Sequence, residues 1–523
     1  MSAKDLLTPF DLDIYHWKPL SSDNPSEGRI RPLGGGENTQ DVFNRYLKGE
    51  QTLFFGLLVG LGSPRSREEL VNASRKAWVW LRYHIPLVAS RIEIAEGDTP
   101  MLVYRTESAA EVATWASRTF IVDEQASGNI DLDGLRHKLG PMKVPSGDGD
   151  QAWLHLVPGV VDANGAVSQF GLLLHTHHTP YDGVGLKIIF NRYLAQLAQL
   201  LDPQEAVESP LSWGKELDNL PPAVFTILAP TEPLPVPPTS SEEPTFANPY
   251  YASLGANPHG FVPKAIPEEW PDSQRASVIF TKDESAAVMK ALKHSSGVKY
   301  TLTHIAHAAL AMTVLADNPP TSDAASKALY NLSLADCRDR LKEPYSSREG
   351  YPGYALGVQA MGLPVNVFLS DKGEPLPLDK NTLGKAAKAL RNLYAAEKDL
   401  PARLSYMAHG AIIFGGQMKQ GISASMFPLN QGYSFSSDGP GERYLNATFT
   451  DSTGTTCLTV EHFFTSLNRT DPGPFFRISS WGGIIDLSAD FNAKSTPVET
   501  AKKYVTQWKE FMILASEFED ENY

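Results

Sequence analysis

The stretch His175-Thr-His-His-Thr-Pro-Tyr-Asp-Gly-Val-Gly185 decides the interpretation of this chain. The apolar segment before it, from Ser168 to Leu174, is typical of a buried strand. Apolar residues at helical spacing follow it and stop at Asp202-Pro203, which predicts a helix after the stretch. A polar cluster with one proline and two glycines is therefore expected on a sharp turn between two apolar elements.

The two adjacent histidines of this turn are candidates for acid–base chemistry. Because side chains alternate along a strand, His178 is expected to share a face with Thr176, and His177 to share the opposite face with His175. Whichever face meets a cleft would present one of the two. An imidazole, with a pKa near ~6.5, is suited to accept a proton from a substrate hydroxyl at neutral pH. We predict that His178 is this general base, against the alternative that it is a hydrogen-bonded structural residue.

Zinc binding is a second interpretation of the same residues. His175 and His177 could chelate a zinc ion from one strand face, since imidazole is a common zinc ligand. No further histidine or cysteine follows at ligand spacing. His304 and His307, three residues apart in a predicted helix, also lack a third partner and are expected on the helix surface. We therefore predict no metal site and no bound cofactor.

Composition restricts the class of protein and its partners. The chain has 523 residues, of which 42% are hydrophobic and 20% charged, as expected for a globular protein of more than one domain. Its net charge of −14, from 46 basic and 60 acidic residues, argues against nucleic acid and anionic membranes as partners. With only Cys337 and Cys457, no signal peptide at the start and no apolar run long enough to span a bilayer, we expect a cytoplasmic protein.

The two halves of the sequence open in a similar way on either side of a proline-rich segment. Each has a short apolar strand, then a capping-box pattern (Ser66-Arg-Glu-Glu69 and Thr281-Lys-Asp-Glu284), then an amphipathic helix. Many prolines between them exclude a helix interior or a central strand. We predict an α/β (α+β) fold of two related domains, 1–201 and 274–523, joined by a proline-rich crossover, 202–273.

Other patterns predict further elements of the second half and of the region before the motif. We expect strands over 87–94, 330–334, 445–449, 458–464 and 475–487, and helices over 385–397, 405–413 and 496–518.

Three motifs carry a resemblance to a known superfamily. His177-His-Thr-Pro-Tyr-Asp-Gly183 resembles the HHxxxDG signature of the acyltransferases that include chloramphenicol acetyltransferase, peptide-synthetase condensation domains and the BAHD enzymes. Asp336-Cys-Arg-Asp-Arg340 resembles the short Asp/Arg motif of the BAHD group, and Ser436-Ser-Asp-Gly439 resembles its Ser-Asn-x-Gly turn near the acyl channel. The Asp-Phe-Gly-Trp-Gly motif of plant BAHD enzymes is missing. The chain looks closest to fungal trichothecene 15-O-acetyltransferases.

This resemblance implies a fold, a reaction and roles for individual residues. It implies two chloramphenicol-acetyltransferase-like domains with a tunnel between them, and transfer of acetyl from acetyl-CoA to the C15 hydroxyl of a trichothecene. No acyl-enzyme is required if His178 acts as general base. Asp182 is expected to point away from His178 and to pair with an arginine. Gly183 is expected at the turn, where its backbone N–H could bind the oxyanion. The acyl-donor channel is expected to include Ser436, Ser437 and Gly439, with either serine hydroxyl as the alternative oxyanion donor.

The arginine partner of Asp182 is predicted from the strand that precedes Arg338 and Arg340. If the chain stays extended after that strand, both arginines project from the same face. We choose Arg338, which is nearer the strand, and keep Arg340 as the alternative.

Two other functions remain possible for such a sequence: condensation with an acyl group held by a carrier protein, and non-catalytic binding on the same fold. Carrier proteins are generally acidic, so the net charge of −14 disfavours the first. The intact His178 and Asp182 disfavour the second, and an assay of CoA release would discriminate. We expect a monomer whose partners are a small-molecule alcohol and acetyl-CoA as co-substrate.

Overall fold

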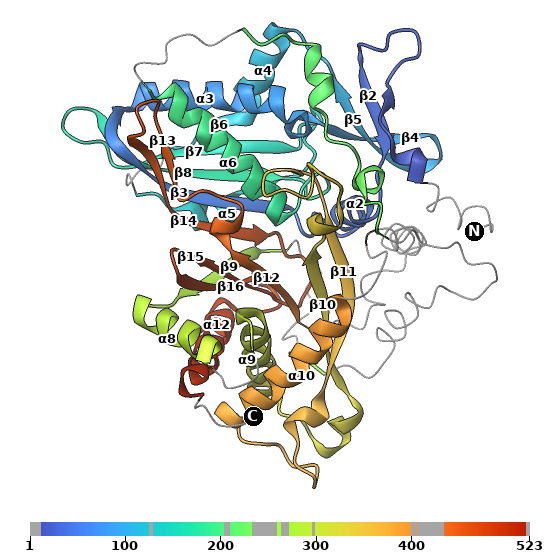
Figure 1. Ribbon diagram of the computed structural model, residues 1–523, viewed down its shortest axis with the longest axis vertical. Helices are drawn as coiled ribbons and strands as arrows, with labels where there is room; N and C mark the ends of the chain where they lie inside the picture. Colours follow the sequence, from blue (N-terminus) through green and yellow to red (C-terminus); the bar gives the residue numbers. More distant parts are fainter. Residues whose placement is uncertain are drawn as a thin grey trace.

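The computed structural model describes residues 12–124, 129–202, 210–232, 259–262, 271–294, 299–398, 404 and 433–518. These residues form two lobes that are stacked along the long axis of the molecule (Figure 1). The upper lobe of this view is built around a six-stranded sheet, and the lower lobe around a four-stranded sheet.

The N-terminal lobe has its core between the six-stranded sheet and two long helices. The strand order is β13-β14-β3-β8-β7-β6, and α3 and α6 cover one face of the sheet (Figure 1). The bounds are β3 Leu53–Ser66, β6 Phe120–Val122, β7 Ala152–Pro158, β8 Ala166–Thr176, β13 Thr448–Thr450, β14 Thr456–Leu467, α3 Arg67–His84 and α6 Gly183–Leu200.

Alternation along β3 and β8 explains why these strands lie at the centre. Phe55 and Leu57 point to the helix-covered face, and Leu174 pairs with Phe55 across the antiparallel ladder. Helix α3 begins at Ser66, whose hydroxyl accepts the backbone N–H of Glu69 as the capping pattern predicts.

Two strands of this sheet come from the C-terminal half of the sequence. β14 pairs antiparallel with β3, and β13 pairs with β14 at the edge. The sheet that holds the histidine motif therefore needs residues from both sides of the proline-rich segment. The domain boundaries drawn at 202–273 stay a prediction, since most of that segment lies outside the described residues.

A smaller sheet and several helices complete the N-terminal lobe. The small sheet has the order β1-β2-β5-β4. The bounds are β1 Lys18–Pro19, β2 Gly28–Pro32, β4 Arg91–Ala95, β5 Thr99–Arg105, α2 Gly36–Tyr46, α4 Ala109–Thr119 and α5 Leu132–Leu139.

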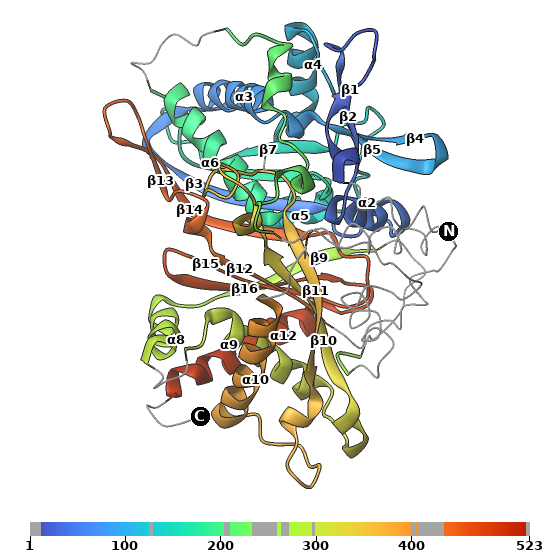
Figure 2. The same ribbon diagram turned by 45° about the vertical axis from the view of Figure 1, so that its right-hand side comes forward.

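The C-terminal lobe is a sheet with helices on the side away from the N-terminal lobe, as both ribbon views show (Figures 1 and 2). Its strand order is β12-β15-β16-β9, and a separate ribbon is formed by β10 and β11. The bounds are β9 Ser273–Ile279, β10 Ala328–Asp336, β11 Leu356–Pro364, β12 Ser434–Pro440, β15 Phe475–Trp481, β16 Ile484–Asn492, α8 Lys282–His294, α9 Leu302–Asp317, α10 Lys380–Lys398 and α12 Val498–Ile513.

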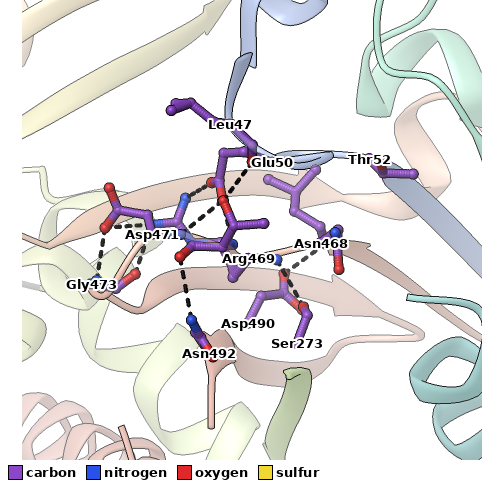
Figure 3. Close-up of polar contacts among 12 residues, drawn as sticks. Leu47, Glu50, Thr52, Ser273, Asn468, Arg469, Asp471, Gly473, Asp490 and Asn492 are labelled. Carbon is purple, nitrogen blue, oxygen red and sulfur yellow. Dashed lines mark hydrogen bonds and ion pairs between the residues drawn. The ribbon is translucent and has the colours of Figure 1, made fainter. Parts of the chain in front are cut away.

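A buried polar cluster, formed in part by residues that directly follow β14, joins the two lobes (Figure 3). The Glu50 carboxylate accepts hydrogen bonds from the guanidinium of Arg469 and from the backbone N–H of Asp471, the latter at 3.1 Å. The backbone N–H of Arg469 donates to the hydroxyl of Ser273 at the start of β9, at 2.8 Å. From α5, Arg136 donates to the same hydroxyl at 2.8 Å. Ser273 thereby connects the C-terminal sheet to the N-terminal lobe.

The predicted fold class is confirmed, while several details differ. Residues 87–94 are not one strand, because Pro86–Ala89 forms a short 3-10 helix before β4. Residues 475–487 form two strands, since Gly482 and Gly483 both adopt positive φ and turn the chain back. His307 is buried instead of lying on the helix surface: the Tyr394 and Tyr433 hydroxyls hydrogen-bond its two ring nitrogens. The expected helix over 405–413 lies outside the described residues.

Candidate active site

The histidine loop, residues 177–182, connects β8 to α6. The strand ends at Thr176, so the alternation that assigned faces to the two histidines extends to neither His177 nor His178, and that part of the prediction is wrong. The backbone N–H of His177 still donates to the carbonyl of Gln151 beside β7, at 2.8 Å. The hydroxyl of Thr179 donates to the carbonyl of Glu37 in α2, at 3.1 Å. The loop is thus held from two sides.

His178 has one ring nitrogen engaged and one available. Its Nδ1 lies 2.7 Å from the carbonyl oxygen of Tyr181. A carbonyl can only accept, so Nδ1 carries the proton and Nε2 is the basic nitrogen. Within the described part of the chain Nε2 makes no hydrogen bond, and the side chain is 8% exposed. Burial lowers the pKa of His178, which keeps the ring neutral at pH 7.

His177 has the opposite arrangement. Its Nδ1 accepts the backbone N–H of Thr179 at 3.1 Å, so the proton of the neutral ring is on Nε2. Burial, reinforced by His178 when that ring is protonated and by the charge of Arg45, lowers the pKa of His177 to about 3. His177 is therefore a fixed acceptor that shapes the loop, whereas His178 offers a free basic nitrogen.

Asp182 is bound by the C-terminal lobe and forms no hydrogen bond with the His178 ring. Its carboxylate accepts hydrogen bonds from Arg338 at 3.0 and 3.1 Å. It also accepts the backbone N–H of Gly185 at 2.7 Å, which caps α6, and that of Ala355 at 2.8 Å. The side chain is completely buried. The predicted ion pair is present, and the triad geometry, with the carboxylate on the imidazole, is absent.

Arg338 uses all five of its N–H groups. Besides Asp182, it donates to Asp336 at 3.0 Å, to the carbonyl of Tyr351 at 2.9 Å and to that of Gly353 at 2.6 Å. Burial alone lowers its pKa, but the carboxylates of Asp182 and Asp336 more than offset this and raise it. Because every N–H group of Arg338 already has an acceptor, neither side chain of the pair can move without breaking a hydrogen bond. The pair is therefore rigid.

The geometric reason given for choosing Arg338 is nevertheless wrong. The chain after β10 does not stay extended, since Arg338–Arg340 forms a 3-10 turn. This turn separates the two arginines, and Arg340 pairs with Glu232 at 3.1 Å.

The two glycines of the motif have different reasons to be glycine. A Cβ on Gly185 would lie 2.3 Å from the carbonyl oxygen of Pro352, so no larger residue fits between α6 and the C-terminal lobe. A Cβ on Gly183 would meet only a methyl group of Thr465, at 3.9 Å. Packing among the described residues therefore does not require glycine at 183. Its backbone N–H belongs to the first turn of α6, where helix amides lack an intrahelical acceptor.

The predicted donor-channel residues lie in β12. The Ser436 hydroxyl donates to the carboxylate of Asp438 at 3.1 Å, and the Ser437 hydroxyl lies 2.8 Å from that of Thr303 in α9. Gly439 has a positive φ of 65°, at an irregularity in the pairing of β12. Both serine hydroxyls are thus engaged within the protein.

Two buried cations near this strand were missed by the sequence reasoning. Lys187 of α6 donates to the carbonyl of Asp438 at 3.1 Å, and Arg477 of β15 donates to its carboxylate at 2.9 Å. No local pattern relates residues so far apart in sequence. The available signal was Lys187 within a helix whose buried residues are mostly apolar.

The described residues offer neither a metal cluster nor a membrane-spanning helix. Among them, no group of three or more His, Cys, Asp or Glu side chains could hold a metal ion. None of the described helices is both long enough and apolar enough to cross a membrane.

Solved structures similar to this one define the class of fold. TRI3 trichothecene 15-O-acetyltransferase from Fusarium sporotrichioides is similar with a TM-score of 0.81, at 17% identity over 96% of this chain and 98% of that chain. The starter condensation domain of rhizomide synthetase is also similar, with a TM-score of 0.55 at 10% identity over 96% of this chain and 97% of that one. The fold is that of the condensation-type acyltransferases, with two chloramphenicol-acetyltransferase-like lobes.

The sequence places the chain within this class. A model of the family described as 15-O-acetyltransferase Tri3 matches residues 67–356, more than half of the chain, and the chain belongs to this family. Trichothecene 15-O-acetyltransferase TRI3 from Fusarium sporotrichioides is 22% identical over 98% of this chain and 99% of its own length. Trichothecene O-acetyltransferase TRI3 from Trichoderma arundinaceum is 22% identical over 88% of both chains.

Proposed function

We propose that this protein transfers the acetyl group of acetyl-CoA to the C15 hydroxyl of a trichothecene, with His178 as the general base. Membership of the Tri3 family supports the reaction and the substrate class. The observation that carries the mechanism is the hydrogen bond from His178 Nδ1 to the Tyr181 carbonyl, which leaves Nε2 unprotonated and without a partner among the described residues.

The reaction follows from this tautomer. Nε2 of His178 removes the proton of the acceptor hydroxyl while the alcohol oxygen attacks the thioester carbonyl carbon. The tetrahedral intermediate then collapses, the carbon–sulfur bond breaks, and the leaving sulfur takes the proton from Nε2. The imidazole returns to its starting state, and no acyl-enzyme forms.

The surrounding residues have supporting roles. Asp182 and Arg338 hold the start of α6 and, through it, the position of the histidine loop. For the oxyanion we assign the backbone N–H of Gly183, because the hydroxyls of Ser436 and Ser437 already form hydrogen bonds. Ser436, Ser437 and Gly439 remain the proposed lining of the donor channel.

Thiol release from acetyl-CoA tests the general base. His178→Ala should lower kcat by at least ~10²-fold, the usual contribution of a positioned base, while CoA binding measured by calorimetry persists. His177→Asn is the matched control: its amide oxygen can accept the Thr179 N–H, so kcat should stay close to that of the wild-type protein. Equal losses in the two variants would contradict the assignment of His178.

Acceptor and donor specificity test the substrates. A trichothecene with a free C15 hydroxyl should be acetylated, and the same compound blocked at C15 should not be, as mass spectrometry would show. Acetyl-CoA should support turnover, whereas an acetylated carrier protein should not. Initial rates should show a ternary-complex pattern, because no acyl-enzyme forms. An acetylated protein trapped after incubation with acetyl-CoA alone would refute the direct mechanism.

A further inference from the structure

Lys187 is a buried charge that the proposed reaction does not use. It lies one turn into α6, five residues after Asp182, and its side chain is only 1% exposed. Nζ donates to the backbone carbonyl of Asp438 at 3.1 Å and lies 5.1 Å from the centre of the Phe463 ring. Burial lowers the pKa of Lys187. An apolar residue of this length would be less costly to bury here, so the ammonium group needs another explanation.

The carbonyl that Lys187 binds belongs to a β-bulge. β12 runs parallel to β15 with Ser437 opposite Ile478 and Gly439 opposite Ser479, which leaves Asp438 as the extra residue. A bulge interrupts the ladder, and its backbone groups need other partners. The Asp438 carbonyl finds one in Lys187, and its carboxylate accepts from Arg477 at 2.9 Å.

The bulge and the histidine loop share their electrostatic surroundings. The positive charge of Arg477, which holds the bulge, also lowers the pKa of His178, although burial, the backbone hydrogen bonds of the ring and Asp182 all have larger effects. Lys187 lies in the first turns of α6, and Asp182, the last residue of the histidine loop, caps this helix. Helix α6 therefore follows the histidine loop of the N-terminal lobe and also binds the Asp438 bulge of the C-terminal lobe.

We propose that Lys187 is a positioning residue, whose ammonium group fixes the Asp438 bulge of β12 against the first turns of α6. It thereby sets the distance between the Ser436–Gly439 segment of the C-terminal lobe and His178 of the N-terminal lobe. This role rests on the proposed acetyl transfer, in which both segments face the reacting groups.

Lys187→Met separates this role from a merely structural one. Methionine keeps most of the stem and removes the donor and the charge. A structural lysine predicts unchanged kcat with equal or higher stability, since replacing a buried charge by an apolar residue is often neutral or stabilising. A positioning lysine predicts that kcat falls on the order of 10- to 100-fold while Tm is kept, because small displacements of reacting groups cost such factors. Lys187→Arg should restore part of kcat.

Hydrogen exchange provides a readout without substrate. In Lys187→Met, amides of 434–440 should exchange faster than in the wild-type protein, and those of β16 should not change. Equal exchange in 434–440, or wild-type kcat in the variant, would overturn the proposal. If Lys187→Met does not fold, Lys187→Gln takes its place in both measurements. If the wild-type protein transfers no acetyl group, the proposed function fails, and the exchange comparison still decides whether Lys187 holds β12.

Asn191→Leu is the matched control on the same helix face. Asn191 also links α6 to the C-terminal half of the chain: its side chain accepts the backbone N–H of Asn446 at 2.8 Å and donates to Glu349 at 3.3 Å. Neither of these contacts involves β12. We expect lower stability with unchanged kcat, and a loss of kcat equal to that of Lys187→Met would show that any loosening of α6 suffices.

Discussion

The Arg338–Asp182 and Arg469–Glu50 pairs are both buried and both join distant parts of this chain, but they differ in how completely the N–H groups of the arginine are satisfied. Beside His178, Arg338 uses every N–H group, and Asp182 accepts four hydrogen bonds. Two residues after the end of β14, Arg469 binds Glu50, but its buried Nε has no partner in the described structure (Figure 3). Burial raises the pKa of Glu50 despite the charge of Arg469. The completely satisfied pair is the one that holds the histidine loop.

This difference suggests a division of roles. A saturated pair fixes the direction of each bond, as a catalytic loop requires, whereas an incompletely satisfied pair mainly attaches one segment to another. Variants of the two pairs should therefore separate loss of activity from loss of stability.

The largest effect is expected at Asp182. Asp182→Ala leaves two N–H groups of the buried Arg338 without an acceptor, with Asp336 as its remaining carboxylate partner. This should cost up to roughly 3–5 kcal/mol of unfolding free energy and nearly all activity. Denaturant unfolding and thiol release measure the two losses. The double variant Asp182→Ala with Arg338→Met also removes the incompletely hydrogen-bonded arginine, and it should recover part of the stability but not the activity. An unchanged Tm with lost activity would instead indicate a catalytic triad.

A smaller effect is expected at the second pair. Glu50→Gln keeps one oxygen, which can accept either from Arg469 or from the Thr470 and Asp471 N–H groups but not from both, and it loses the charge. The change should cost at least about 1.5–3 kcal/mol, the range for hydrogen bonds to charged groups. Below the unfolding transition, kcat should stay within about twofold of the wild-type value. This corresponds to a change of well under ~1 kcal/mol in the activation free energy. A large loss of kcat would show that this cluster also positions the active site and would end the contrast.

Acid should distinguish the two regions because folding shifts the pKa values of their titratable groups in opposite directions. The pKa of His177 in the folded state is about 3, below the ordinary value, so the unfolded state binds the extra proton and stability falls as the pH decreases below ~6.5. At pH 5 this amounts to about 2 kcal/mol. The pKa of Glu50 is raised in the folded state, so the folded state binds the extra proton. The contribution of Glu50 to stability therefore decreases as the pH rises through that pKa.

Urea unfolding between pH 7 and pH 5 checks both signs. His177→Asn should lose less stability than the wild-type protein over this range, and Glu50→Gln should lose more. Parallel curves for all three proteins would refute both assignments.

The smallest effect is expected at Arg340. It binds Glu232 in a partly exposed position away from the histidine loop. Arg340→Gln should cost no more than about 1 kcal/mol and leave kcat unchanged. A loss comparable to that of Asp182→Ala would mean that the whole 3-10 turn, and not Arg338 alone, holds Asp182.

The local part of this architecture could be predicted from sequence. The apolar strand, the turn residues and the helical spacing placed β8, the histidine loop and α6, because each depends on neighbouring residues. The partner of Asp182 was chosen correctly as Arg338, although the extended conformation assumed for it is replaced by a 3-10 turn.

The long-range part could not be predicted. The attachment of β14 to β3, the burial of His307 between two tyrosines and the contact of Lys187 with Asp438 all join segments far apart in the chain. They depend on tertiary packing, for which composition and periodicity carry no signal. The roles of His178, Gly183 and the β12 residues stay predictions until variants are measured.

The entry of β13 and β14 into the N-terminal sheet has a consequence for synthesis on the ribosome. β3 pairs with β8 early, but its other edge waits for residues 456–467, which are translated far later. Until then the nascent chain exposes an unpaired strand edge beside apolar residues such as Phe55 and Leu57, a surface that favours aggregation. A fragment that ends in the proline-rich segment would keep this open edge permanently. The two halves of the sequence therefore mature as one folding unit and are poor candidates for separate expression.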